Sequence, residues 1–227
     1  MSYGTAIAAF VCGLTALHLL ISPTRFWLPQ VLLAVFFGLF AALLALTTIQ
    51  LEMPDMQIGP IKVAVVLTFL PIAYLFCQAI AHPHNTALTQ RDAMHLAPAV
   101  AAVAVFLYGD GLLLDIIVLS TEAIYTLLTL QLVLRGRSAI DLPKRFQSMA
   151  YRWNQFFLAF YGILLAADIA IAIQLSDGST ARSSSAFVFT AIGLFIAATF
   201  VGLGAMGKNS IFTWLETQLP PKAGKPT

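Results

Sequence analysis

Charged side chains are scarce in this chain: Asp, Glu, Lys and Arg make up 10% of its 227 residues, against about 25% in a soluble domain. Hydrophobic residues account for 59%. A hydrocarbon core about 30 Å thick needs about 20 predominantly apolar residues in a helix. We therefore predict an all-α, polytopic membrane protein with seven transmembrane helices, at residues 4–21, 27–50, 60–81, 93–108, 111–134, 154–175 and 186–206.

Cysteine and histidine are also few, with two and four residues. Cys12 and Cys77 both fall inside predicted helices, where a thiol is a small apolar filler, so a disulfide framework is not expected. His82 and His84 lie in a turn-like spacing, and no carboxylate or cysteine set completes a metal site around them. We expect no metal and no cofactor.

Familiar catalytic motifs are missing, since the sequence contains neither G-x-S-x-G nor H-E-x-x-H. The longest predicted connection between helices, roughly 135–153, has fewer than 20 residues. The predicted helices leave no room for a soluble catalytic or DNA-binding domain. The sequence therefore predicts a protein that is not an enzyme and does not bind nucleic acid directly.

Basic residues are divided unequally between the two sides of the membrane that seven helices would define. Placing the N-terminus outside puts 10 of the 12 Lys and Arg on the cytoplasmic side and leaves Lys62 and Arg182 outside. Because cytoplasmic loops carry an excess of Lys and Arg, we predict an N-terminus outside and a cytoplasmic C-terminus. Helical spans rather than a barrel indicate a bacterial inner membrane. We expect a seven-helix domain over 1–219 and a disordered cytoplasmic tail over 220–227.

Three acidic residues fall inside the predicted helices: Asp115 and Glu122 in 111–134, and Asp168 in 154–175. An ionisable group in a membrane helix is costly and usually faces the bundle interior or a wet cavity. Asp115 and Glu122 are seven residues apart and so share a helix face, with Tyr125 three residues further on the same side. The predicted topology places Glu122 near mid-depth and Asp168 in the outer half of its helix.

Two interpretations of these residues stay open. In the functional one, Glu122, Asp168, Tyr125 and Asp115 line a cavity that opens to the periplasm and binds a cationic or hydroxylated ligand. In the other, each acid is protonated or hydrogen-bonded to a polar neighbour and only locks helices together. For Asp115, a surface position at the start of a helix is favoured.

Residues 89–98 combine two local signals. Thr89 followed by Asp92 is typical of a capping box that opens a helix. Pro98, like Pro71 in the preceding predicted helix, is expected to kink its helix, and kinks create cavities.

The same region carries a resemblance to a known family. Residues 69–75 (FLPIAYL) precede a polar turn and residues 91–98 (RDAMHLAP). This stretch resembles the P-x-x-Y-L … R-R-D-x-x-H-x-x-P segment in the membrane sensor domain of seven-helix AraC-type transcriptional regulators. Further similarity lies in Tyr125, the basic loop ending at residues 152–153, and residues 210–212. The resemblance implies seven helices ahead of a cytoplasmic helix-turn-helix domain, which this sequence does not contain.

Two functions are compatible with these features. One is a membrane sensor-like module that binds a small ligand or a partner and signals through a cytoplasmic effector. The other is a non-catalytic accessory or scaffold subunit of a larger respiratory, photosynthetic or transport complex in the inner membrane. Both imply contact with the lipid bilayer and with another membrane protein or a cytoplasmic effector.

Overall fold

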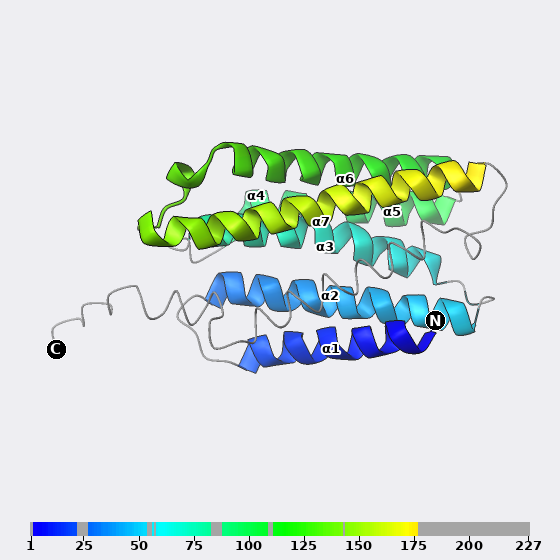
Figure 1. Cartoon of the computed structure of the whole chain (residues 1–227). Helices are drawn as coiled ribbons and strands as arrows, with labels where there is room; N and C mark the ends of the chain where they lie inside the picture. Colours follow the sequence, from blue (N-terminus) through cyan, green and yellow to red (C-terminus); the bar gives the residue numbers. More distant parts are fainter. Residues whose placement is uncertain are drawn as a thin grey trace.

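The computed structural model describes residues 2–21, 27–53, 56, 58–82, 88–108, 111–142 and 144–176, and every regular element in these ranges is a helix. The helices lie alongside one another and alternate in direction (Figure 1). Their order is α1 (Ser2–Ile21), α2 (Trp27–Glu52), α3 (Gly59–Ala81), α4 (Gln90–Ala93), the 3-10 helix η1 (Met94–Leu96), α5 (Ala97–Tyr108), α6 (Gly111–Leu134), the 3-10 helix η2 (Arg137–Ala139) and α7 (Lys144–Ser176).

The described part of the chain contains six helical segments that are long and apolar enough to cross a membrane. They confirm the all-α class and show that these six predicted segments are helices of the length and apolar character that crossing a membrane requires. The six segments are Tyr3–Ile21, Trp27–Gln50, Ile61–Ala81, Gln90–Tyr108, Leu113–Leu134 and Gln147–Ile173. The seventh predicted helix, at 186–206, and the predicted tail at 220–227 lie outside the described residues.

The fourth spanning segment is a broken helix. The capping box is confirmed, because the backbone N–H and the hydroxyl of Thr89 donate to Asp92 Oδ2 at 2.6 and 2.8 Å. α4 then changes to the 3-10 geometry of η1 before α5 begins. Pro98 lies in the first turn of α5, where its missing N–H leaves no helical hydrogen bond unmade. The irregularity expected at Pro98 is thus a change of helix type, whereas α3 continues through Pro71.

The sixth predicted helix is longer than its apolar stretch. It was expected at 154–175, but α7 begins at Lys144. The additional turns carry polar residues such as Gln147 and Arg152, for which hydropathy alone predicts a loop. Helix propensity and packing against the bundle continue the helix past the end of its apolar segment.

Small residues bring α1 and α2 together. Ala8, Cys12 and Ala16, at four-residue steps on α1, are all buried, and such spacing allows close backbone approach in membrane helices. A polar contact joins the two helices at each end. Thr5 Oγ1 lies 2.8 Å from Thr48 Oγ1 at one end, and Gln30 Nε2 donates to the Leu19 carbonyl at the other. Cys12 and Cys77 are free and buried, as expected for apolar fillers.

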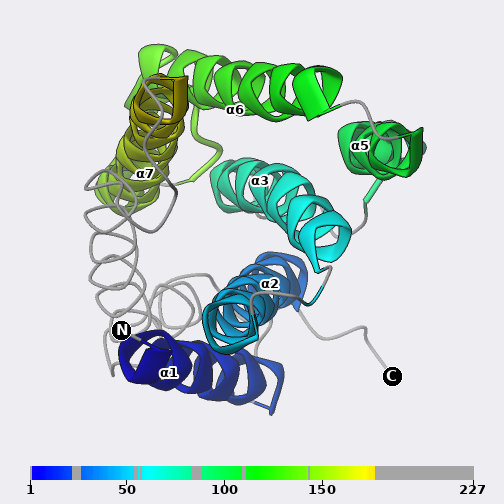
Figure 2. The ribbon, with the colours of Figure 1, turned by 90° about the vertical axis from the view of Figure 1, so that its right-hand side faces the viewer.

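An aromatic core joins α2, α3 and α7. Phe36 of α2 lies 5.8 Å from Phe69 of α3 and 5.4 Å from Phe157 of α7, each pair in an edge-to-face arrangement. Phe40 and Phe160 extend this cluster. α3 is the central element, because it packs against α2, α5, α6 and α7 (Figure 2).

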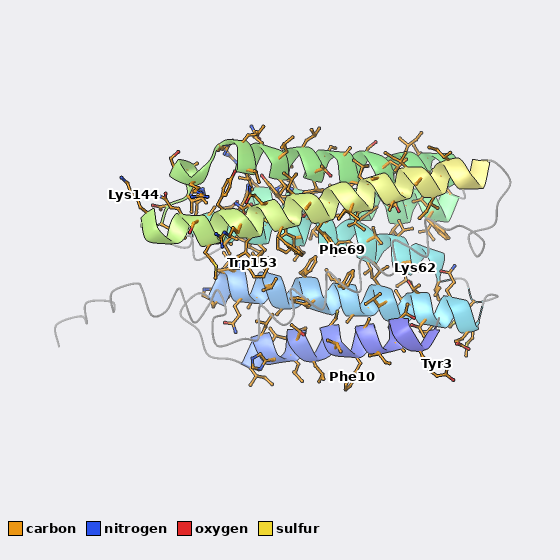
Figure 3. All side chains as sticks on the ribbon, in the orientation of Figure 1. Tyr3, Phe10, Lys62, Phe69, Lys144 and Trp153 are labelled. Atoms are coloured by element: carbon orange, nitrogen blue, oxygen red, sulfur yellow. The ribbon has the colours of Figure 1, made fainter. Side chains whose placement is uncertain are left out.

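Exposed basic side chains gather at one end of the bundle, which we call the basic end. It is formed by the end of α3, the start of α4, the end of α6 and the start of α7, joined by a 2.8 Å hydrogen bond from Asp141 N–H to the Ala81 carbonyl. Lys62 lies at the opposite end, far from Lys144 (Figure 3), and donates to Gln50 Oε1 at 2.8 Å. The basic end carries Arg91, Arg135, Arg137, Lys144 and Arg152.

Candidate functional site

Glu122 and Asp168 meet at the interface of α6 and α7. The Glu122 side chain is 2% exposed, and its carboxyl group interacts with that of Asp168, which is half-buried. The second carboxyl oxygen of Glu122, Oε2, has no hydrogen-bond partner in the protein. The sequence places these two acids at compatible depths on consecutive spanning helices, and the structure brings them into direct contact.

This contact constrains the charge of the pair. An ionised carboxylate only accepts hydrogen bonds, so a hydrogen bond between two carboxyl groups requires a proton on at least one of them. Two negative charges at this separation would also repel strongly in a membrane interior. The pair therefore holds at least one proton while the two groups stay bonded.

Tyr125 joins a different cluster from the one its spacing suggests. Its hydroxyl lies 2.8 Å from His95 Nδ1 and donates to the His95 carbonyl at 3.3 Å. The Tyr74, His95 and Tyr125 rings are mutually 5.5–5.8 Å apart, and Gln78 Nε2 donates to the Tyr74 hydroxyl at 2.7 Å. We call Tyr74, Gln78, His95 and Tyr125 the aromatic clasp, because they tie α3, η1 and α6 together.

The clasp unites residues from the two halves of the segment 69–98. Tyr74 comes from the first half and His95 from the second. Their contact gives the spacing of that segment a structural reason, since α3 and η1 must present both rings to α6.

Asp115 does not join the Glu122–Asp168 pair. It is exposed in the second turn of α6, about 10 Å along the helix axis from Glu122. This is the surface position near a helix start that the sequence favours. Asp115 is therefore not among the residues that build the buried site.

Three further buried polar residues on these two helices were not selected from the sequence: Thr129 on α6, and Asn154 and Tyr161 on α7. Tyr161 is 1% exposed, and its hydroxyl donates to the Leu70 carbonyl at 2.6 Å, one residue before Pro71. Thr129 and Asn154 are buried, and Thr129 Oγ1 and Asn154 Oδ1 lack hydrogen-bond partners in the protein. An unsatisfied buried polar atom costs about 1–3 kcal/mol, so these residues do not serve packing alone.

A seven-residue spacing connects these positions and was visible in the sequence. Glu122 and Thr129 share a face of α6, while Asn154, Tyr161 and Asp168 follow each other at seven-residue steps on α7. We call this set the polar seam. Its signal was missed because Thr and Asn in a membrane helix are common and usually satisfied locally.

Other threonines show that local solution. Thr47, Thr68 and Thr126 each donate to the carbonyl four residues earlier, at 2.7–2.8 Å. Such a bond satisfies the hydroxyl within its own helix. Thr129 makes no such bond, so its buried hydroxyl has no hydrogen-bond partner in the protein.

Comparisons of this chain with protein-family models, with curated proteins and with solved structures find no match. The resemblance of residues 69–98 to the AraC-type sensor domain therefore stays a prediction. In the described ranges, no three His, Cys, Asp or Glu side chains gather as a metal site. The site is defined by its own chemistry, a buried carboxyl pair with an unpartnered oxygen.

Proposed function

We propose that this protein is a membrane-embedded, sensor-like module that binds a small ligand at the Glu122–Asp168 pair and signals through a cytoplasmic effector. The observation that carries the proposal is Glu122 Oε2, a buried carboxyl oxygen without a protein partner. An ionisable group kept inside a membrane bundle at such cost is by default a functional residue. The matching ligand group is a hydrogen-bond donor, cationic or hydroxylated.

The clasp supports signalling between this site and the basic end. Tyr125 lies about one helical turn from Glu122 on α6, so a displacement of α6 at Glu122 also moves the Tyr125 hydroxyl. That hydroxyl is bonded to His95 in η1, next to α4 and Arg91 at the basic end. A ligand that changes the Glu122–Asp168 contact thereby changes the position of η1 relative to α3 and α6.

The full architecture of the proposal has seven helices in a bacterial inner membrane, with the N-terminus outside and the basic end in the cytoplasm. The positive-inside rule supports this orientation, and the resemblance to the AraC-type sensor domain supports the helix count. The effector would meet the basic end, where Arg135, Arg137 and Arg152 are exposed. Its docking surface is expected to be acidic.

The accessory-subunit function rests on a different feature, the apolar outer faces of the helices. Phe10 on α1 and Leu107 on α5 are 66% and 77% exposed. Such side chains suit lipid and equally suit another membrane protein. Purification of the full-length protein from native membranes in a mild detergent, followed by identification of everything that comes with it, separates the two functions.

The site itself is tested by ligand-dependent thermal stabilisation of the purified protein against a panel of amines and hydroxylated compounds. We expect at least one compound to stabilise the native chain but not Glu122→Gln. Glu52→Gln is the matched control, because Glu52 is exposed at the end of α2. A compound that stabilises all three proteins equally would place its site elsewhere. A stoichiometric membrane complex without any responding compound would favour the accessory subunit.

A further inference from the structure

All buried side-chain atoms that lack a hydrogen-bond partner in the described ranges belong to α6 or α7. They are Glu122 Oε2, Thr129 Oγ1 and Asn154 Oδ1, and each is an oxygen that accepts hydrogen bonds. The helices α1 to α5 contribute none of them. The polar seam thus differs chemically from every other described helix interface, because it offers acceptors that no protein group uses.

The register of α6 and α7 places the residues that carry these oxygens at successive levels along the two helices. The two helices are antiparallel (Figure 1), and the Glu122 and Asp168 carboxyl groups interact, so that Thr129 lies at the level of Tyr161 and Asn154 near the last turn of α6. Seven residues correspond to about 10 Å along a helix axis. This row of residues therefore leads from the middle of the membrane-spanning part of α6 to the basic end.

In the described ranges, no comparable row leads to the opposite end. Beyond Glu122 in that direction, the hydroxyl of Thr121 is satisfied by the Ile117 carbonyl at 2.7 Å. On α7, residues 169–173 (IAIAI) are all apolar. The sequence predicts a cavity that opens to the periplasm, whereas the described unpartnered oxygens lead toward the end that carries the basic residues.

Buried polar atoms in native proteins are normally satisfied, and ordered water is the usual partner where the protein supplies none. We propose that water occupies the α6–α7 interface from Asn154 to Glu122, and that the ligand exchanged by the Glu122–Asp168 pair is a proton arriving from the basic end. This inference rests on the proposed function for the location of the site and names its ligand.

The proton step is balanced without any further reactant. A water bonded to Glu122 Oε2 gives its proton to the ionised carboxylate and recovers one from the next water, so that the bulk solution at the basic end loses one proton. No bond other than O–H forms or breaks. The pair moves from one shared proton to two, and the charge between α6 and α7 changes by one.

Titratable groups near the pair come from each element packed against α6. They are Tyr125 on α6, Tyr161 on α7, Tyr74 and Cys77 on α3, and His95 in η1. α5 contributes only Tyr108, at its exposed end. The described charged groups on these elements lie at or toward the bundle ends: Lys62 on α3, Asp115 on α6, Arg135 after α6, and Lys144 and Arg152 on α7.

Infrared difference spectroscopy of the full-length protein in lipid vesicles tests this inference. We expect a protonated-carboxyl band in the native protein that shifts when the buffer is changed from H₂O to D₂O, and that Glu122→Gln and Asp168→Asn each reduce. The combined variant Thr129→Val and Asn154→Leu should retain the band. Its hydrogen–deuterium exchange should be slower by at least about tenfold, which is the effect on a rate of losing one hydrogen bond that stabilises the water along the path. Each single variant is measured as well, in case the combination does not fold.

Thr68→Val is the matched control, because the Thr68 hydroxyl is satisfied by the Ala64 carbonyl on α3; its exchange rate should equal that of the native protein. A band that exchanges equally fast in the seam variants overturns the path, and a native protein without a carboxyl band overturns the proton as ligand. A compound that stabilises the protein through Glu122 while no band exchanges leaves the proposed function standing and this inference refuted. Carboxyl exchange through the seam without any stabilising compound refutes a small-molecule ligand and supports the proton.

Discussion

The pair α1–α2 and the pair α6–α7 solve the same problem of holding two membrane helices together in different ways. Between α1 and α2, small residues bring the backbones close, and the polar groups at the two ends bond to each other. Between α6 and α7, a carboxyl pair forms the contact, and three buried oxygens have no partner in the protein. The first interface is explained by packing, and the second carries polar groups that packing does not require.

This difference separates stability from function within one bundle. Lipid is as apolar as the side chains it replaces, so helix association in a membrane depends on close packing and on satisfied polar contacts. A buried polar group that contributes neither close packing nor a satisfied polar contact lowers the stability of the bundle. Its presence in α6 and α7, beside an acid pair, is the reason to look for chemistry there rather than in α1 and α2.

The largest expected effect is on the aromatic core that supports both regions. Phe157 is 0% exposed and packs against Phe36 and Phe76 at 5.4 and 5.5 Å. We expect Phe157→Ala to lower the free energy of unfolding by about 3–5 kcal/mol, because it opens a cavity in a close-packed core. Denaturant unfolding in mild detergent measures this, with the 66% exposed Phe10→Ala as control. Equal losses in the two variants would contradict the assigned core.

A smaller effect is expected from overpacking α1 against α2. Cys12 is 2% exposed between Ala8 and Ala16, so Cys12→Leu should separate the two helices and cost about 1–3 kcal/mol. Leu17→Phe, on the exposed face of α1, is the comparison and should unfold as the native protein does. Tolerance of Cys12→Leu would mean that close packing is not what holds α1 to α2.

Removing a satisfied hydrogen bond between two helices should lower the free energy of unfolding by less than either of these changes in packing. Tyr161→Phe keeps the ring but deletes the bond to the Leu70 carbonyl, and such bonds contribute about 1 kcal/mol in membrane proteins. Tyr3→Phe, at an 84% exposed position, should have no measurable effect. Thermal unfolding of both variants, in parallel with the native chain, provides the comparison. An unchanged Tyr161→Phe would show that this hydroxyl does not hold α7 to α3.

The smallest expected change in stability, that of Thr129→Val, is the most direct test of the difference between the α1–α2 and α6–α7 interfaces. Thr129 Oγ1 has no protein partner, so Thr129→Val, which keeps the side-chain shape, should change the unfolding free energy by less than about 0.5 kcal/mol, or raise it slightly. The same thermal unfolding experiment measures it. A loss as large as that of Tyr161→Phe would show that the Thr129 hydroxyl is bonded to another group of the protein, and both helix pairs would then be held by satisfied polar contacts.

Much of the fold and a part of the site were predictable from local sequence. Hydropathy located the six described spanning helices, and the Thr89–Asp92 pair located the start of the fourth. Glu122 and Asp168 could be identified as unusual before their contact was known, because placing an ionisable side chain inside a membrane helix is energetically costly. The surface position of Asp115 followed from its place near the start of a helix.

What each residue touches was decided by the tertiary structure. Local sequence sets the period and length of a helix, but the rotation and axial shift between two helices depend on the packing of all their neighbours. The register of α6 against α7 joins Glu122 to Asp168, while the position of α3 and η1 turns Tyr125 toward His95. In the same packing, Thr129 Oγ1 and Asn154 Oδ1 have no hydrogen-bond partner in the protein, and no local sequence signal could have shown this, because it depends on what neighbouring helices place beside each oxygen.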